Sequence, residues 1–381
     1  MKKKIVLVNQ STGYLFIDVA NAFSESDYDV VLMAGDVLPM NEPLNTGKIK
    51  VEKIFAYDRS STIRRFYSWI ISLIKIWWLL VFKYRKYDLL LSSNPPTAST
   101  MLPVFFRRNI SLLIYDIYPD GLVAGSFVTP KSVIYKCWAW FNRMAYKKVN
   151  KIIVLTPGMA TAMEAYAPKD KITVVSAWAS STNKHAVIPA SENLFLKKYN
   201  LQDKFIVMYS GNLGKEYELE SHVNLAEECR NNENIRFVIM GKGWKKDLLE
   251  NLIREKQLDN CMLLPYQEPA LFLHSLNAFH IGVVSLAAAV AKLALPSKTY
   301  NLLAAHRPIF CIGNKTSDLA NFLTKNEIGK AFEANEISEI KLFIEKAYSD
   351  KEYFERLCSN AERTAQNYTK EKAKKIVELV Q

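Results

Sequence analysis

The stretch FIVMYSGNLGK, residues 205–215, decides the fold class of this chain. Its first part, residues 205–209, is a short apolar run without strict alternation, which is typical of a strand covered on both faces. Its second part, residues 210–215, holds two glycines and a lysine, and the glycines let backbone amides approach an anion closely. Ligands of open α/β sheets bind beyond the carboxyl ends of the strands, so this turn is the first candidate binding loop.

Similar apolar runs alternate with helical patterns through the whole chain. The further strand candidates are residues 5–8, 29–33, 88–92, 110–115, 152–155 and 172–175 in the first half, and 235–240, 261–264, 279–284 and 309–312 in the second. Between two of them, residues 245–256 place four apolar side chains on one helical stripe. Alternating strands and helices predict parallel, doubly wound sheets, and two such series predict two domains. We therefore expect an α/β protein with two doubly wound, Rossmann-like domains.

Length and composition agree with this expectation. With 381 residues, 49% of them hydrophobic, the chain can bury two cores, and the polar stretch 179–191 is the candidate linker. Five dispersed cysteines without ligand spacing are typical of a reducing compartment and predict no zinc site. The lysines at 2–4 precede only four apolar residues, too few for a signal peptide, so we expect a buried first strand and a cytoplasmic protein.

The net charge of +12 is carried almost wholly by the first half of the chain. Residues 1–190 hold 24 basic and 13 acidic side chains, whereas residues 191–381 hold 26 and 25. A one-sided field favours an anionic partner, such as a membrane, a nucleic acid or a phosphorylated substrate, and a solubilising surface is the alternative. Because the basic half offers no recognisable RNA- or DNA-binding module, we expect no nucleic acid partner.

The segment WIISLIKIWWLLVF, residues 69–82, combines tryptophans with basic flanks. It is shorter than the roughly 20 apolar residues that span a bilayer, and Lys75 interrupts it. Tryptophans beside cations suit the lipid headgroup region, so we expect this segment to contact an anionic membrane surface. The alternative is a helix packed inside the first domain. The predicted membrane-contact residues are Arg64, Arg65, Trp69, Trp77 and Trp78.

Two further loops carry lysine where a phosphate would bind. The strand candidate 235–240 runs into a Gly-Lys-Gly turn at 241–243. Pro296 then breaks the chain before a short helix, in which Ser297 is the candidate cap and Lys298 lies near the amino terminus. Three cation-bearing loops predict a diphosphate ligand. The chain has no GxxxxGK[ST] motif and no GxGxxG after its first strand, which argues against an ordinary nucleotide hydrolase or dehydrogenase.

Seven segments in order carry a family resemblance. They are SNPPTAS (93–99), YDIYPDG (115–121), KKVNKIIVLTPGMA (147–160), FIVMYSGNLGKEYELESHVNLAEEC (205–229), IRFVIMGKGWKKDLLENL (235–252), CMLLPYQEPALFLHSLNAFHIGVVSL (261–286) and LPSKTYNLLAAHRPI (295–309). Together they resemble retaining GT-B glycosyltransferases, above all family 4, the group that builds capsule, colanic-acid-type and O-antigen polysaccharides. The resemblance implies a GT-B fold, in which two Rossmann-like domains face each other across a cleft. It also implies an acceptor domain at 1–185, a donor domain at 186–365, and a helix at 366–381 that crosses back onto the first domain.

The resemblance also implies roles for single residues. Lys215 and Lys298 would neutralise the donor diphosphate, and the turn at Tyr266 would line the base pocket. Asn301 stands where the family usually has a glutamate that grips the donor ribose, and Leu293 stands where its acidic partner usually lies. The expected donor-binding residues are Gly211, Asn212, Gly214, Gly241, Lys242, Gly243, Tyr266, Ser297, Thr299 and Asn301.

Sugar transfer from such a donor requires positive charge on the departing diphosphate. We predict Lys215, Lys298 and Asp116 as catalytic residues, the last because no histidine lies in the first 184 residues. Gly13 and Asp120 are predicted on the acceptor side, with a simple turn residue as the alternative for Asp120. We expect a UDP-sugar donor and no metal ion or other cofactor. The expected acceptor is a polyprenyl-pyrophosphate-linked glycan at the inner face of the cell membrane.

Two other functional classes stay open. A sugar-nucleotide epimerase uses the same fold but needs dedicated acid and base residues, and the first domain is poor in histidine. A nucleotide- or lipid-binding relative without catalysis is favoured by the departures at Leu293 and Asn301.

Overall fold

Strand β1 (Lys3–Val8) lies in the middle of the first sheet, and its last four residues are completely buried. Six further strands extend this sheet in the order β5–β3–β1–β6–β7–β8–β9, and every neighbouring pair is parallel. A small parallel pair, β2 (Ser11–Thr12) with β4 (Asp36–Val37), is separate. The other strands are β3 (Tyr28–Ala34), β5 (Ile49–Lys53), β6 (Asp88–Ser92), β7 (Ile110–Ile114), β8 (Lys151–Val154) and β9 (Ile172–Val174).

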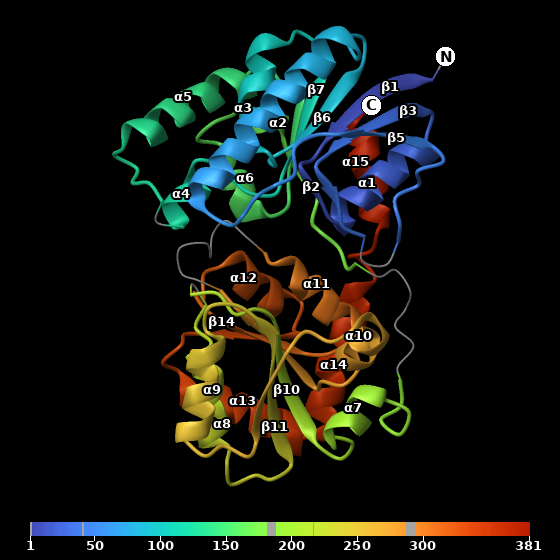
Figure 1. Ribbon diagram of the computed structural model, residues 1–381. Helices are drawn as coiled ribbons and strands as arrows, with labels where there is room; N and C mark the ends of the chain where they lie inside the picture. The colour runs from blue at the N-terminus through green and yellow to red at the C-terminus, as the bar shows by residue number, and fades with distance from the viewer. Residues whose placement is uncertain (1, 40–41, 126, 181–187, 216, 287–294) are drawn as a thin grey trace. The chain divides into compact units, whose positions relative to one another are not determined.

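Helices cover both faces of this sheet (Figure 1). On one face α1 (Tyr14–Glu25) and α15 (Glu371–Val380) pack side by side, and their buried side chains join a core with residues of β1 and β3. On the other face α3 (Pro96–Phe105) contacts β6. Helices α2 (Thr62–Phe82) and α5 (Val133–Tyr146) pack against α3. The short helices are α4 (Asp120–Ala124) and α6 (Pro157–Met163).

Helix α2 is longer than the predicted segment. It begins at Thr62 because the hydroxyl of Ser61 caps it by accepting from the amide of Arg64. Its inner face is pinned by Gln10, whose Nε2 donates to the carbonyl of Ser68 at 3.0 Å and to the hydroxyl of Ser72 at 2.9 Å. Among the residues described, α2 is the one helix long and apolar enough to cross a membrane, so the length argument against spanning is wrong. The argument against spanning is instead that α2 packs with one side against the rest of unit 1, where a third of its apolar stretch is buried.

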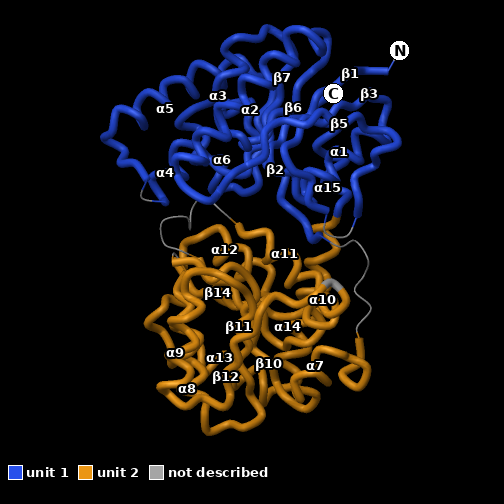
Figure 2. The backbone as a smooth tube through the Cα atoms, in the orientation of Figure 1, with its two compact units in different colours: residues 1–180, 370–381 blue, residues 181–369 orange. Residues whose placement is uncertain are grey.

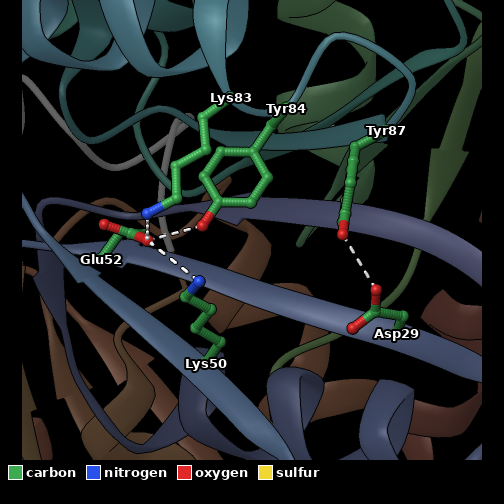
Figure 3. Close-up of polar contacts among 6 residues, drawn as sticks. All are labelled: Asp29, Lys50, Glu52, Lys83, Tyr84 and Tyr87. Atoms are coloured by element: carbon green, nitrogen blue, oxygen red, sulfur yellow. Dashed lines mark hydrogen bonds and ion pairs between the residues drawn. The ribbon is translucent and has the colours of Figure 1, made fainter.

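The carboxyl end of α2 is fastened to the sheet by the polar contacts drawn in Figure 3. Lys83 and Tyr84 both donate to Oε1 of Glu52 on β5, at 2.7 and 2.5 Å. Next to them, the hydroxyl of Tyr87 donates to Asp29 on β3 at 2.9 Å. These contacts, together with the hydrogen bonds from Gln10, determine which side of α2 faces away from the sheet.

The second sheet is also wholly parallel, in the order β12–β11–β10–β13–β14–β15. Alternate residues of its strands enter two cores, so that Val207 packs on one face and Met208 on the other. Its strands are β10 (Phe205–Asn212), β11 (Ile235–Lys242), β12 (Cys261–Leu264), β13 (Ile281–Ser285), β14 (Ile309–Ile312) and β15 (Gly329–Phe332). Its helices are α7 (Leu194–Tyr199), α8 (Glu220–Glu228), α9 (Lys246–Glu255), α10 (Pro269–Leu276), α11 (Ser297–Ala304), α12 (Asp318–Lys325), α13 (Ile337–Ser349) and α14 (Lys351–Ala365).

The chain divides into two compact units (Figure 2). Unit 1 comprises residues 1–180 and 370–381, and unit 2 comprises residues 181–369. The sequence-based boundaries are 185/186 and 365/366, and the candidate linker lies largely in residues outside the described part of the chain. This computed structural model describes residues 2–39, 42–125, 127–180, 188–215, 217–286 and 295–381. Both units are doubly wound α/β structures, which confirms the predicted fold class.

Candidate active site

The carboxyl ends of two neighbouring strands bring the first two predicted loops together. Strands β10 and β11 pair so that Gly211 lies opposite Gly241 and Asn212 opposite Lys242. Beyond the strands the pairing continues, because the amide of Leu213 donates to the carbonyl of Lys242 at 2.9 Å. We call the combined surface of residues 210–215 and 241–244 the glycine edge.

Close backbone approach requires glycine at this edge. A Cβ atom on Gly241 would lie 1.9 Å from the carbonyl oxygen of Gly211. Gly243 has a φ of +154°, and a Cβ there would lie 2.5 Å from the carbonyl oxygen of Leu213. A Cβ on Gly211 would lie 3.0 Å from Nζ of Lys298. Side chains at these positions would part the two loops or displace the lysine.

Lys298 reaches the glycine edge from the first turn of α11. Its Nζ donates to the hydroxyl of Tyr209 at 3.1 Å and lies 4.2 Å from the centre of the same ring. That hydroxyl in turn donates to the carbonyl of Asn212 at 2.7 Å. The chain of contacts holds the ammonium group beside Gly211 at the amino-terminal end of a helix, where backbone amides also favour an anion.

The surroundings of Lys298 are poor in compensating charge. Burial lowers the pKa of Lys298 to about 8, and the nearby Cys311 opposes this only in part. No carboxylate contributes to that shift. An ammonium group held without a carboxylate partner attracts an incoming anion more strongly than a paired one does.

Two polar side chains beside Lys298 lack hydrogen-bond partners. His222 on α8 packs edge-on against Tyr209, with ring centroids 5.4 Å apart, and both of its ring nitrogens are buried and unpaired among the described residues. Burial and then the charge of Lys298 lower the pKa of His222 to about 3, so the imidazole is neutral. The hydroxyl of Thr299 is likewise buried without a partner in the described chain. Buried polar groups without a partner are uncommon in folded proteins, and two of them directly beside Lys298 are available to a bound ligand.

The remaining donor-side predictions lie around this centre. Lys215 is exposed, with its Nζ 4.1 Å from the centre of the Trp244 ring, and therefore links the two loops from outside. Ser297 is exposed at the first helical position, and the helix cap is Pro296 without a side-chain bond, so the predicted capping role of Ser297 is wrong. Asn212, Lys242, Gly243 and Tyr266 are exposed, Gly214 is buried, and Asn301 is half-buried. Leu293 lies outside the described residues.

The predicted catalytic and acceptor-side residues of unit 1 lie in or next to the loops that follow its strands. Asp116 follows β7 and is exposed, and its amide donates to the hydroxyl of Ser93 at 3.1 Å. Asp120 accepts from Tyr135 at 3.0 Å and from Tyr166 at 2.5 Å, one hydroxyl on each carboxylate oxygen. These bonds favour the structural alternative for Asp120. Gly13 is the amino-terminal cap of α1, and its surroundings leave room for a side chain.

The predicted membrane-contact residues do not all lie on the surface. Trp69 is 1% exposed and packs against Phe66, Tyr118 and Trp138 on the inner side of α2, so its predicted membrane contact is wrong. Trp77 and Trp78 are 44% and 55% exposed. Arg64 is exposed and Arg65 is half-buried, with its guanidinium over the ring of Phe127.

Sequence reasoning missed Tyr209, His222 and Trp244. Only Tyr209 left a signal, as the one aromatic residue at the end of an aliphatic strand directly before the glycine turn. Within the part of the chain that the structure describes, no group of three or more His, Cys, Asp or Glu side chains is suited to hold a metal ion.

Comparison with known proteins finds similarity to glycosyltransferases, above all in the second unit. The family described as "Glycosyl transferases group 1" matches residues 191–364. WbjE of Pseudomonas aeruginosa, described as a probable glycosyltransferase, is 22% identical over 258 residues, which is 66% of this chain and 63% of WbjE. WcaI of Escherichia coli strain K12, whose name assigns it to colanic acid biosynthesis, is 29% identical over 170 residues. That match covers 43% of this chain and 40% of WcaI, so the chain spans less than two thirds of either relative.

Solved structures agree with the fold. Anabaena Alr3699/HepE in complex with UDP superposes with a TM-score of 0.75 at 14% identity, over 99% of this chain and 98% of that one. The arrangement of α/β elements along nearly the whole chain is therefore that of the GT-B proteins.

Proposed function

Because residues 191–364 of this chain match the glycosyl transferases group 1 family, we propose that the protein transfers a sugar from a nucleoside-diphosphate sugar to a glycan acceptor. The observation that carries the proposal is the ammonium group of Lys298, held beside Gly211 without a carboxylate partner. A diphosphate supplies the missing negative charge, and the backbone amides of the glycine edge supply further donors. The UDP bound by Anabaena HepE supports UDP as the nucleotide.

In the proposed reaction, the bond between the anomeric carbon and the diphosphate oxygen breaks, the acceptor hydroxyl oxygen bonds to that carbon, and the hydroxyl proton passes to an oxygen of the leaving diphosphate. Negative charge grows on the leaving diphosphate, where Lys298 stabilises it. Lys215, exposed beside the Trp244 ring, adds a second cation. Asp116 of unit 1 orients the acceptor hydroxyl. We propose retention of configuration, as the family resemblance implies. We also propose that no metal ion or other cofactor is needed, because the lysines supply the positive charge that leaving-group departure requires.

The proposed acceptor is a lipid-linked glycan of surface polysaccharide biosynthesis, met at the cytoplasmic face of the membrane. The name of WcaI supports this class of product. The basic first half of the chain and the exposed tryptophans of α2 support a position at an anionic membrane surface. Capsule and O-antigen are the polysaccharides that the proposal covers.

A donor-turnover assay tests the proposal. The protein is incubated with UDP-, GDP- and TDP-sugars, with and without EDTA and with a polyprenyl-pyrophosphate glycan extract, and free nucleoside diphosphate is measured. We expect turnover with one donor, unchanged by EDTA and accelerated by the lipid extract. An epimeric sugar nucleotide as product would assign the epimerase activity instead. Binding of UDP without turnover of any donor would assign a non-catalytic binding protein.

A further inference from the structure

An apolar groove lies on the outer side of unit 1, where α2, α3 and α5 meet. Its volume is about 430 Å³, and every residue lining it belongs to these three helices or to the residues that begin them. The lining side chains that define it are Ile70, Leu73, Met101, Ile134, Cys137 and Phe141. Ile70 and Ile134 are 50% and 59% exposed, so the groove opens to the outside of the unit.

The groove offers almost nothing to a polar ligand. The indole Nε1 of Trp138 donates to the hydroxyl of Thr100 at 3.0 Å, and that hydroxyl donates to Oδ1 of Asn142 at 2.8 Å. The hydroxyl of Thr97 donates to the backbone carbonyl of Trp69 at 3.2 Å. Because the polar atoms of the lining are satisfied inside the unit, an occupant gains free energy there only by burying apolar surface.

The surroundings of the groove continue the apolar surface and add positive charge. The exposed apolar side chains of α2 and α5 are Ile63, Tyr67, Ile70, Ile74, Trp77, Trp78, Phe82, Val133, Ile134 and Trp140. Two neighbouring helices with this many exposed apolar side chains are typical of a contact with a partner or a membrane. Helices α2, α3 and α5 contain no aspartate or glutamate, and their cations are Arg64, Arg65, Lys75, Lys136 and Arg143.

This charge distribution selects the occupant. Tryptophan and arginine also occur at protein interfaces, but such interfaces usually set charges of both signs against each other. Three helices that together carry cations and no acid around an apolar groove suit an anionic lipid surface instead. Asp58, just before α2, is the acid that lies 3.9 Å from Arg64, and it neutralises only that end of the helix.

We infer that the groove between α2, α3 and α5 receives one hydrocarbon chain of an anionic membrane lipid. This hydrocarbon chain leaves the bilayer and enters the groove beside Ile70 and Ile134, while the lipid headgroup stays near the cations of α2 and α5. This inference rests on the membrane position in the proposed function and adds a defined lipid site to it. The donor chemistry of unit 2 does not depend on it.

Cys137 makes the occupancy of the groove measurable. It is the exposed one of the five cysteines, Cys358 is half-buried in unit 2, and the other three are buried. A water-soluble maleimide is therefore expected to modify Cys137 fastest, and the rate at Cys358 is the internal reference. The ligand is dodecyl phosphate below its critical micelle concentration, so that one chain is offered without a bilayer. At about ten times its dissociation constant, we expect the rate at Cys137 to fall about tenfold.

Two matched variants separate the groove from the charged face. Ile134→Asp places a carboxylate in the groove, whereas Val133→Asp places it on the same helix outside the lining; both residues are exposed, so both variants are expected to fold. Protection of Cys137 by dodecyl phosphate should be lost in Ile134→Asp and kept in Val133→Asp. Inorganic phosphate should protect in neither.

Several results would overturn the lipid site. Protection by phosphatidylglycerol vesicles without protection by monomeric dodecyl phosphate would mean that a bilayer covers the groove and leaves it empty. Protection that grows with protein concentration and needs no lipid would assign the groove to a second copy of this chain. In either case, donor turnover measured in parallel in Ile134→Asp reports on the transferase proposal separately.

Discussion

The two units carry the same kind of parallel sheet but place their positive charge in opposite ways. In unit 2, Lys298 is held at the strand ends beside the glycine edge, where burial lowers its pKa to about 8. In unit 1, the cations of α2 and α5 stand on the outer helices next to exposed apolar side chains. An inward charge suits a small anion bound at one point, whereas an outward array suits an extended anionic surface.

The largest effect on stability is expected on α2, which carries one tryptophan, Trp69, on its buried side and two, Trp77 and Trp78, on its exposed side. Trp69→Ala removes a buried side chain and should destabilise unit 1 by about 3–5 kcal/mol, seen as a lower Tm. Trp77→Ser combined with Trp78→Ser removes exposed side chains and should leave the Tm nearly unchanged while weakening flotation with phosphatidylglycerol vesicles. If the double variant unfolds, the outward face of α2 is part of the core and the comparison between the units fails.

The next effect concerns the inward charge. Lys298→Met should lower kcat by about 10²–10³-fold, because the variant loses a donor to the leaving diphosphate. Its Tm at pH 7 should nevertheless rise, since below pH 8 the fold carries the whole penalty of burying the ammonium group. That penalty is released only as pH rises from about 8 to the usual pKa of lysine, so the gain should fade in that window. Near-normal kcat in Lys298→Met would show that the lysine does not stabilise the leaving diphosphate and has only a structural role beside Tyr209.

A pair of glycine substitutions compares a glycine packed against backbone in unit 2 with a glycine that has free space around it in unit 1. Gly241→Ala brings a Cβ within 1.9 Å of the carbonyl oxygen of Gly211 and should destabilise unit 2 by about 1–3 kcal/mol, with loss of UDP binding. Gly121→Ala, in α4 of unit 1, meets no atom within 4 Å and should stabilise that unit by about 0.5–1 kcal/mol. Thermal unfolding with and without UDP measures both. Equal tolerance at the two positions would mean that the glycine edge can open freely.

The smallest expected effect is a pH dependence of UDP binding. The ammonium form of Lys298 binds the diphosphate, and with a pKa of about 8 it is lost as pH rises above that value. The Kd for UDP should therefore rise up to about tenfold per pH unit above 8 in the wild type. Calorimetry between pH 7 and 9 measures this slope, and Lys298→Met should lack it. A slope that survives in the variant would place the titrating group elsewhere.

Strands with a continuous apolar run could be predicted from the sequence even at the edge of a sheet, as β9 and β12 were, whereas strands without such a run could not. The runs 261–264 and 309–312 match β12 and β14 residue for residue, since a short apolar run is visible without knowing its neighbours. Strands β5 and β15 went unrecognised, and both lie at the edge of their sheets. Most residues of β5 are exposed or half-buried, so its sequence carries no continuous apolar signal. The start of α2 was missed for a related reason, because Arg64, Arg65 and Ser68 interrupt the apolar pattern before Trp69.

Only those residues of the candidate site could be predicted that neighbouring residues in the sequence mark. Lys298 was found because a proline break and a helix start mark its position within a few residues. Its partner Tyr209 lies 89 positions earlier in the chain, and the contact exists only after β10 and α11 come together. The buried imidazole of His222 has the same origin, since helix α8 must first pack on the sheet. Contacts of this kind are set by tertiary packing, which a single sequence does not display.

The return of α15 to unit 1 has a consequence for the order in which the protein is made. Helix α1 is translated early, but the buried residues Ala373, Ile376 and Val377 that cover it come from the last helix described. Unit 2 lies between them as one uninterrupted stretch, residues 181–369. At roughly 5–20 residues per second, the ribosome needs about ten to forty seconds to cross that stretch. During this time unit 2 can begin to fold while the apolar side of α1 stays uncovered, so the nascent chain is expected to depend on chaperones through unit 1, although unit 1 is the first to leave the ribosome.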